Sequence, residues 1–415
     1  MKKIISIMLL IATFFVWYGC EEGRLNYIDN LAPAPAPVTL DAVTSKPGGA
    51  VIKYKIPNDR NLLGVKAVYI RNGELCETKA SLYVDSLIVE GFGDTQPKEV
   101  KLYSVGKNGK LSEPLSVQVM PLTPSVFSAQ IDMESGFGGV IVALSANLSK
   151  ANLALVLMID TLKTGDWIPL QTFYTQSTSM KFSRRGLKPE EQQFALYIRD
   201  RWNNKSDTLF KDLIPIAEEK IPKDKFKNAK LTGDSFAEAE NNSRYRLENI
   251  WDVVDASSGY REIFANQFSS PMPQQFTIDL GRKVGISRFQ LLPRSTDERY
   301  SGSYPRTFQL WGSTNPPIDG SYNNWFLLGE WSVSKPSGYG EGGAVGTITA
   351  EDLDYFNTRQ EYELIVSDQV TDPYQTISYL RFRTTSTFTT YGTEAKTGQV
   401  IIGEITLWGQ LRDEE

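Results

Sequence analysis

The sequence contains no histidine and only two cysteines, Cys20 and Cys76, among its 415 residues. Histidine is the usual general base near neutral pH and the commonest protein ligand of transition metals. Its absence excludes Ser-His-Asp and Cys-His catalysis, and it excludes zinc sites built on histidine. Glycoside hydrolysis remains open because it needs only two carboxyl groups, and calcium sites remain open because their ligands are oxygen atoms.

Runs of basic residues and long apolar segments are also missing from most of the chain. The net charge is −5, and lysine and arginine form no block. Nucleic acids are therefore not expected as partners, because binding them needs a basic stripe. After the N-terminus no run of about 18 apolar residues occurs, so no membrane-spanning helix is predicted. The length suggests two to four domains of ordinary folded composition.

The N-terminus has the features of an export signal. Two lysines precede an apolar run over residues 4–18, which ends at Gly19 and Cys20. This order resembles a bacterial lipoprotein signal, in which cleavage precedes the cysteine and a diacylglycerol is attached to its thiol. The resemblance implies a signal peptide over residues 1–19 and lipidation of Cys20. The alternative is a plain secretory signal with an incidental cysteine. If Cys20 is lipidated, Cys76 has no partner for a disulfide.

Residues 20–37 are expected to form a stalk. Two acidic residues, Glu21 and Glu22, follow the cysteine, and alternating Ala-Pro over residues 32–37 favours an extended polyproline conformation. Acidic residues in this place resemble the surface-export signal of Bacteroidetes lipoproteins. The resemblance implies an outer-membrane protein that is held by its acyl chains and faces the cell exterior.

Two stretches after the stalk are similar to each other. Leu102-Tyr103 recurs 94 residues later as Leu196-Tyr197, and Pro121 recurs as Pro215 at the same spacing. Alternating apolar residues between turns predict β-strands. Copies of this size suggest immunoglobulin-like or fibronectin-III-like sandwiches over residues 38–121 and 122–214. The fibronectin-like form is preferred because the Cys-Trp-Cys pattern of immunoglobulins is missing. A charged, proline-containing linker is expected over residues 215–231.

The last third of the chain shows a recognisable order of short strands, predicted over residues 276–281, 286–292, 308–313, 379–383 and 401–409. This order resembles the discoidin family, also called the coagulation factor 5/8 type C family or galactose-binding-like. The resemblance implies a jelly-roll β-sandwich over residues 232–412 that binds ligands with the loops at one end. The predicted fold class is therefore all-β, with two tandem sandwiches followed by a third.

Three loop segments of this domain carry the candidate ligand-binding residues. In sugar-binding discoidin domains, an arginine after the second strand and an aromatic residue before the last strand line the pocket. Arg294 falls at the first position, and Phe388 or Tyr391 at the second. The candidates are Tyr260, Arg294, Asp297, Arg299, Tyr300, Tyr304, Phe388 and Tyr391. Arg294 could instead pair with Asp297 or Glu298, and the tyrosines could be packing residues.

The resemblance also implies one structural calcium ion. Asp252 lies where the calcium loop of the family begins, and Glu404, on the last strand, lies where an acidic ligand is often found. Carboxylate and carbonyl oxygens are the ligands that calcium prefers. The alternative is that Glu404 pairs with a strand arginine such as Arg381 or Arg383.

Together these features predict a non-catalytic, lipid-anchored surface protein that binds a glycan or polysaccharide. The domain order resembles a known lipoprotein arrangement, and the Asp200–Asn204 loop carries that resemblance in the second unit; the resemblance implies an association with the polysaccharide-uptake machinery of the outer membrane. One alternative is an adhesion or assembly lipoprotein that binds protein partners. Another is a glycosidase, for which Asp297, Glu298, Glu330 and Glu341 supply carboxylates.

Overall fold

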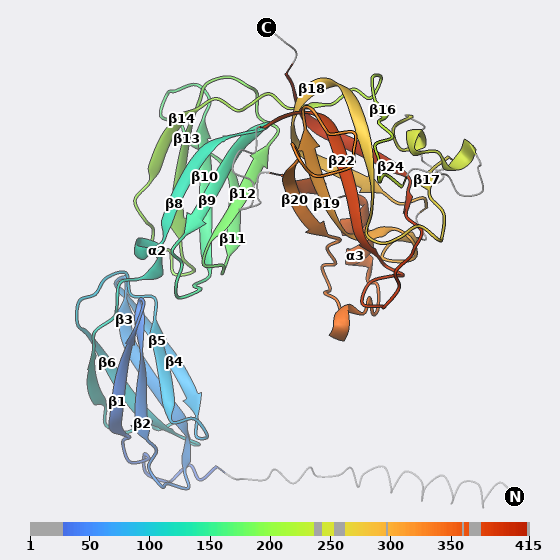
Figure 1. The fold of residues 1–415 in the computed structure, drawn as a ribbon. Coiled ribbons are helices and arrows are strands. Elements are labelled where there is room, and N and C mark those ends of the chain that lie inside the picture. Colours follow the sequence, from blue (N-terminus) through green and yellow to red (C-terminus); the bar gives the residue numbers. More distant parts are fainter. Residues whose placement is uncertain are drawn as a thin grey trace, which may run out of the picture.

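The computed structural model describes residues 28–235, 243–252, 262–295, 298–358, 361–364 and 375–412. Strands dominate, and they build three sandwiches in sequence order (Figure 1). The prediction of an all-β chain is confirmed. The predicted residues Cys20, Tyr260 and Asp297 lie outside the described residues. Within the described ranges, every helix is too short or too polar to cross a bilayer.

The N-terminal sandwich packs a three-stranded sheet, β1-β2-β5, against a four-stranded sheet, β4-β3-β6-β7. Side chains alternate between core and solvent along β2 and β6, as the pleat of a strand requires. Ile52, Val89 and Leu102 are fully buried between the sheets. The strands are β1 Thr39–Lys46, β2 Gly49–Lys55, β3 Leu62–Arg71, β4 Glu74–Ser81, β5 Ser86–Glu90, β6 Lys98–Gly106 and β7 Leu115–Val119.

The middle sandwich repeats this plan with sheets β12-β9-β8 and β11-β10-β13-β14. Its core includes Val142, Leu155 and Phe194. A short helix, α2 (Ser125–Ser128), precedes it. The strands are β8 Gln130–Gly136, β9 Gly139–Ser145, β10 Leu153–Asp160, β11 Ile168–Thr175, β12 Met180–Arg185, β13 Gln192–Arg199 and β14 Leu209–Leu213.

The sequence similarity between these two sandwiches extends to individual hydrogen bonds. In the first, the Ser104 amide donates to the Ser112 hydroxyl at 2.9 Å. In the second, the Ile198 amide donates to the Ser206 hydroxyl, also at 2.9 Å. Both serines therefore fix the same turn after equivalent strands. The 94-residue spacing that the sequence shows between the copies is thus preserved in three dimensions.

The C-terminal sandwich is larger, and its main sheet runs β15-β24-β18-β22-β19-β20, with β16 and β21 also paired to β18. One aromatic-rich core, which includes Phe276, Phe289, Phe308 and Phe382, fills it. The strands are β15 Glu219–Lys220, β16 Lys227–Asn228, β17 Phe264–Ala265, β18 Gln274–Leu292, β19 Pro305–Ser313, β20 Phe326–Ser332, β21 Glu361–Glu363, β22 Thr376–Thr387, β23 Ile401–Ile402 and β24 Glu404–Leu411. The helical segments are η2 Ser243–Tyr245, η3 Leu247–Trp251, η5 Glu341–Gly343 and α3 Ala350–Thr358.

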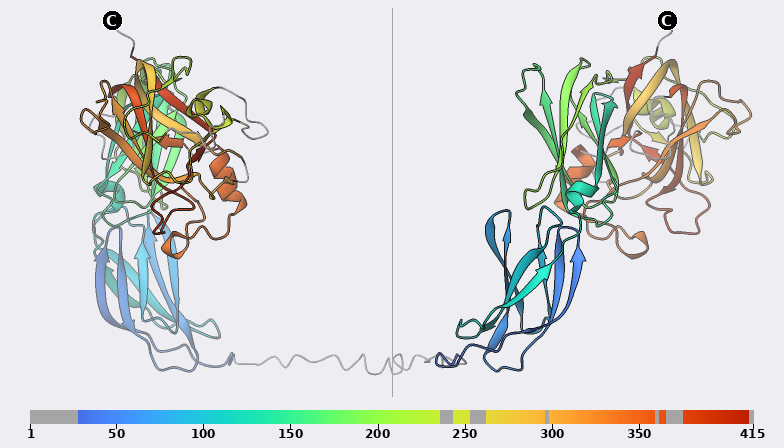
Figure 2. Two further views of the ribbon diagram at one scale, coloured as in Figure 1. Left: turned by 45° about the vertical axis from the view of Figure 1, so that its right-hand side comes forward. Right: turned by 90° about the vertical axis from the view of Figure 1, so that its left-hand side faces the viewer.

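The register of these strands places most of the predicted binding loops at one end of the sandwich. β24 begins opposite Leu292 at one end and finishes opposite Val284 at the other, near the chain's C-terminus. The loops after β18 and β22 meet those before β19 and β24 at the first of these ends, where the Ile401 amide donates to the Ser303 carbonyl at 3.0 Å and the Phe388 amide to the Tyr304 carbonyl at 3.2 Å. The end that contains α3 points toward the side of the molecule where the N-terminal sandwich lies (Figures 1 and 2).

The segment expected to be a linker is part of the C-terminal sandwich. β15 pairs with Trp408 and Gly409 of β24, and β16 pairs with Ile278 and Asp279 of β18. Between them Ile221 is 1% exposed and Phe226 is 7% exposed. Residues 219–228 therefore lie along the sheet as extra strands and not as a free connection.

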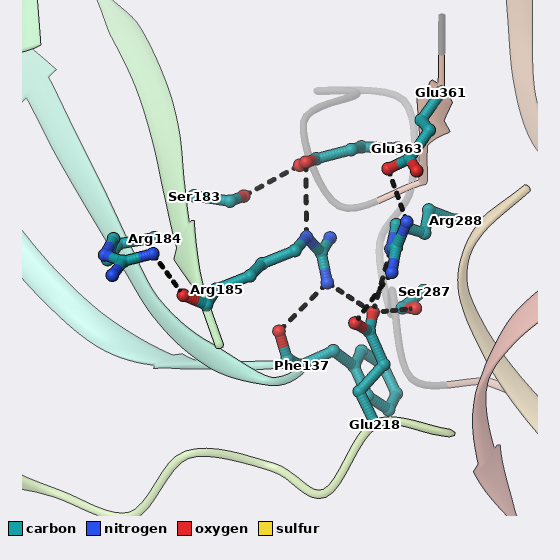
Figure 3. A network of polar contacts seen from close by, with 9 residues as sticks. All are labelled: Phe137, Ser183, Arg184, Arg185, Glu218, Ser287, Arg288, Glu361 and Glu363. Atoms are coloured by element: carbon teal, nitrogen blue, oxygen red, sulfur yellow. Dashed lines mark hydrogen bonds and ion pairs between the residues drawn. The ribbon is translucent and has the colours of Figure 1, made fainter. Parts of the chain in front are cut away.

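A network of charges joins the middle sandwich to the C-terminal one (Figure 3). Glu218 forms ion pairs with Arg185 of β12 and with Arg288 of β18. Its carboxylate also accepts a 2.5 Å hydrogen bond from the Ser287 hydroxyl. Arg185 reaches Glu363 of β21 at 3.3 Å, and Ser183 donates to the same carboxylate at 2.7 Å. These mostly buried contacts fix where the loop end of the C-terminal sandwich points.

Candidate functional site

A pocket of about 360 Å³ lies at the loop end of the C-terminal sandwich, and Arg294 is part of its wall. Its wall comes from the segment before β18, from the loop after β18 and from the segment before β24. Apolar side chains predominate, with two amides and one guanidinium among them. The lining residues are Tyr245, Ile263, Ala265, Gln267, Phe268, Arg294, Gln399 and Ile401.

The Arg294 guanidinium is held in place by a neighbouring carboxylate. Its Nη2 lies 2.5 Å from Oε1 of Glu298, four residues along, while 46% of the side chain remains exposed. Because a guanidinium has five N–H donors, one ion pair leaves others for a ligand. Ion pairing with Glu298 and lining of the pocket therefore occur together.

The floor and the rim of the pocket differ in how far their side chains are exposed. Gln399 is 8% exposed, and its amide nitrogen donates to the Asn266 carbonyl at 2.8 Å. Asn266 is itself fully buried and accepts a 2.7 Å bond from the Val400 amide. At the rim, Phe268 is 74% exposed. The pocket thus combines a fixed polar floor with one aromatic ring that a ligand can cover.

Two of the predicted binding tyrosines are core residues. Tyr300 and Tyr304 are each 1% exposed. Tyr304 donates to the Leu291 carbonyl at 3.0 Å, and Tyr300 donates to the Asp352 carbonyl at 3.0 Å. Burial raises the pKa of both phenols, so they stay neutral and act as hydrogen-bond donors to the backbone. They hold the loop from inside, because polar tips of buried rings need partners.

A buried ion pair supports the loop between β20 and α3. Lys335 and Asp352 lie 3.1 Å apart, with side chains 2% and 0% exposed. Burial alone would raise the pKa of Asp352, but hydrogen bonds from the Thr349 and Ser337 amides and from Lys335 hold it below its usual range. The carboxylate therefore stays charged and ties three points of this loop together.

Tyr391 lies beside this loop, and its ring is partly exposed while one face packs against Arg306. Its ring is 3.5 Å from the Arg306 guanidinium, which also lies 4.4 Å from the Tyr339 ring. Arg306 is 6% exposed, whereas Tyr391 is 38% exposed. At Gly343, where φ is +81°, a Cβ would lie 2.6 Å from Tyr391 Cε1. Only glycine therefore allows this stacking, which leaves the ring's outer side accessible.

Phe388 and Arg299, the other two predicted binding residues of these loops, are less exposed than Tyr391. Phe388 is partly buried and packs edge-on against Tyr300, with ring centroids 6.2 Å apart. Arg299 is half-buried next to Tyr300 and is not part of the pocket wall. Of the predicted binding residues within the described ranges, Arg294 and Tyr391 present the largest exposed surfaces.

The two predicted calcium ligands, Glu404 and Asp252, both lie near the same lysine. Glu404 forms an ion pair with the Lys223 ammonium, and the two side chains are 10% and 7% exposed. Asp252 lies close enough to Lys223 to raise its pKa, against a larger lowering effect of burial. Across the part of the chain that the structure describes, His, Cys, Asp and Glu form no group of three able to hold a metal. Residues 253–261, which follow Asp252 where the calcium loop is expected, lie outside the described residues, and calcium binding stays a prediction.

Several residues of the site carry no signal in the sequence. Phe268 and Gln267 lie in a segment before β18 that the strand pattern leaves unassigned. Lys223 lies in the segment expected to be a linker. The Gln-Val-Ile run at 399–401, directly before the last strand, is a signal that could have been used. Its two β-branched residues favour a strand, which makes Gln399 the last residue before that strand.

A second cleft, of about 490 Å³, lies in the N-terminal sandwich near its junction with the middle one. Ile70 and Leu75 face each other across β3 and β4 and are 62% and 76% exposed. Lys98 and Lys101 of β6 also line the cleft. It lacks an exposed aromatic ring, because Tyr69 and Phe92 beneath it are 5% and 1% exposed.

Three family models match consecutive parts of the chain. Each is described as a domain of unknown function: DUF4959 matches residues 35–121, DUF5126 matches residues 122–224, and DUF5000 matches residues 251–409. No curated protein matches the sequence significantly.

Similar solved structures include the SusE-like protein BT2857, which is 23% identical, with a TM-score of 0.42, over 69% of this chain and 100% of that one. A putative chitobiase fragment from Bacteroides thetaiotaomicron is 15% identical, with a TM-score of 0.30, over 48% of this chain and 96% of the fragment. A two-domain fibronectin type III segment of chicken tenascin is 12% identical, with a TM-score of 0.19, over 44% of this chain and 99% of the segment.

Proposed function

We propose that this chain is a non-catalytic carbohydrate-binding protein of the outer cell surface, anchored by a lipid on Cys20 and accessory to polysaccharide uptake. The observation that carries the proposal is the pocket at the loop end of the C-terminal sandwich. Small-ligand sites are concave and largely apolar, with a few fixed polar groups, and this pocket has that composition.

The chemistry of the wall suits a sugar ring. A pyranose has an apolar face and a rim of hydroxyl groups, so it needs an aromatic surface and forked hydrogen-bond donors. Phe268 supplies the exposed ring, and Arg294 supplies the donors. Glu298 already orients the guanidinium, which lowers the ordering cost of binding.

The binding test uses the full chain in affinity gel electrophoresis and calorimetry against a panel of polysaccharides. For a polysaccharide that binds, Arg294→Ala is expected to weaken affinity by about 10–100-fold, because charged hydrogen bonds contribute about 1.5–3 kcal/mol. Phe268→Ala is expected to weaken it by about 3–10-fold. Arg299→Ala, in the same loop but outside the pocket, is the matched control and is expected to bind normally. Failure to bind any glycan, or normal binding by Arg294→Ala, would contradict the proposal.

The proposal includes the absence of glycosidase activity. Glu298 pairs with Arg294, and Glu330 lies on β20, where it accepts a hydrogen bond from Gln309. Hydrolysis of aryl glycosides by the full chain, with loss of the activity in Glu298→Gln, would instead identify a catalytic carboxylate.

A second candidate function is binding of a protein partner, and the exposed Ile70–Leu75 pair favours it. Contiguous exposed apolar surface is a feature of interaction sites, and these two side chains lie opposite each other in the β3–β4 pairing. If an outer-membrane transporter co-purifies with the wild-type chain and with Phe268→Ala, but not with Leu75→Asp, the N-terminal cleft and not the glycan pocket is responsible.

A further inference from the structure

The C-terminal sandwich contains a buried positive charge where the sequence predicts a metal ion. The Lys223 ammonium is paired with Glu404, the first residue of β24, and both side chains are at least nine-tenths buried. Asp252, directly after η3, is close enough to raise the pKa of the Lys223 ammonium, although burial lowers that pKa more strongly. A lysine therefore stands next to both residues that the sequence assigns to calcium.

The segment that carries Lys223 is fixed on both sides. Before it, the Ile221 amide donates to the Leu407 carbonyl at 2.9 Å, which continues the pairing of β15 with β24. After it, the Phe226 amide closes a turn onto the Lys223 carbonyl at 3.0 Å. Asp224 pairs with Arg282 at 2.6 Å. The contacts on both sides of Lys223 therefore fix the position of the segment that carries it.

The ammonium occupies one oxygen of the carboxylate, Oε1, while Oε2 is buried and has no hydrogen-bond partner among the described residues. A calcium ion would need oxygen ligands at about 2.3–2.6 Å, and it would be repelled by an ammonium in contact with one of them. The lysine already balances the charge of the buried Glu404. It also links the segment at residues 221–226, the end of η3 and the start of β24, which are the parts that a structural ion would hold together.

We propose that Lys223 is the built-in cation of the C-terminal sandwich, so that this domain folds and keeps its loop end in shape without calcium. The lysine comes from the segment that joins the middle and C-terminal sandwiches. Closure of the domain therefore depends on that segment being in place.

The test follows thermal unfolding of the full chain by tryptophan fluorescence. Five of its eight tryptophans belong to the C-terminal part, and Trp251 packs against Phe226 with ring centroids 6.2 Å apart. We expect the same midpoint in EDTA and in millimolar calcium for the wild-type chain. We expect Lys223→Ala to lower the midpoint by on the order of 5–10 °C, because it leaves Glu404 buried and uncompensated.

Two further variants separate the ion pair from simple packing. Lys220→Ala, on the exposed neighbour in β15, is the control and is expected to leave the midpoint unchanged. Lys223→Met combined with Glu404→Gln removes both charges and is expected to recover most of the loss. A wild-type midpoint that rises with calcium and falls with EDTA would overturn the proposal, and so would a Lys223→Ala variant as stable as Lys220→Ala. If Lys223→Ala does not fold, the calcium and EDTA comparison on the wild-type chain decides.

Discussion

The two junctions between the three sandwiches begin alike and end differently. At the first, the Gly48 amide donates to the Leu122 carbonyl at 2.9 Å, and at the second the Gly138 amide donates to the Ile216 carbonyl at 2.7 Å. Beyond this shared turn, the first junction uses neutral amides and one exposed ion pair. The second uses Glu218 between two mostly buried arginines.

The side chains at the first junction come from the loop of the middle sandwich at Asp200–Asn204. Asn204 is 8% exposed, and its side-chain amide donates to the Gly91 carbonyl at 3.2 Å and to Asp200 at 2.8 Å. Arg201 pairs with Glu90, but their side chains are 60% and 40% exposed. This junction can lose one contact and keep the others.

The same backbone turn thus belongs to two junctions whose side-chain contacts differ in how much they stabilise the junction. Charges that are buried together depend on each other, because removing one leaves the others uncompensated in a poor solvent for ions. The hydrogen bonds of a neutral amide such as Asn204 leave no charge uncompensated when one of them is removed. The second junction should therefore hold the C-terminal sandwich more rigidly than the first holds the N-terminal one, and this directs the loop end with the Arg294 pocket.

The largest effect is expected from Glu218→Ala. The change removes the carboxylate that Arg185 and Arg288 share and leaves each with one other partner, Glu363 and Glu361, so we expect a loss of up to about 3 kcal/mol, at the low end for a broken buried pair. Urea unfolding should show this loss in the transition of the middle and C-terminal sandwiches. Hydrogen exchange should rise in β12 and β21, which meet at this junction.

Glu219→Ala is the matched control for that change, since Glu219 is exposed and one residue along. It should leave the unfolding free energy nearly unchanged. Equal stability of the two variants would mean that the Glu218 network does not hold the junction.

A middle-sized effect is expected from Asn204→Ala at the first junction. The change removes the hydrogen bond to the buried Gly91 carbonyl, and an unsatisfied buried group costs about 1–3 kcal/mol. Small-angle scattering should detect a wider range of angles between the N-terminal and middle sandwiches. An unchanged scattering curve together with an unchanged unfolding free energy would mean that the glycine turn alone sets this angle.

The smallest effect is expected from Arg201→Ala. Its ion pair with Glu90 is mostly exposed, and exposed pairs contribute about 0–1 kcal/mol. The unfolding midpoint should stay within about 1 °C of wild type, and added salt should reduce any difference, because exposed charges are screened. A loss as large as that of Asn204→Ala would contradict the division of the two junctions into weak and strong contacts.

The strands and the repeat were accessible from the sequence because their signals are local. Alternating apolar residues mark the buried face of each strand, and the matched serines at 112 and 206 mark the same turn in both copies. The position of Arg294, directly after the end of β18, was accessible for the same reason. Its pairing with Glu298 spans four residues, and the sequence offered it as an alternative.

The tyrosines show that local sequence patterns do not reveal which loop residues are buried. Tyr300, Tyr304 and Tyr391 all lie in polar loops, and nothing in their neighbours distinguishes them. The structure buries the first two under α3 and leaves the third on the surface. Phe356, which packs against both buried tyrosines, is more than fifty residues away, and this distance hides the contact from any local pattern.

The sequence by itself determined the all-β class, the tandem copies and the arginine at the loop end, because strand periodicity and turn chemistry act over a few residues. Only the tertiary structure decided that Lys223 balances Glu404, 181 residues away. It alone made Phe268 the rim of a pocket and turned the expected linker into strands of the last sheet. Contacts of this kind depend on which surfaces the packed sheets bring together, and that is a property of the whole chain.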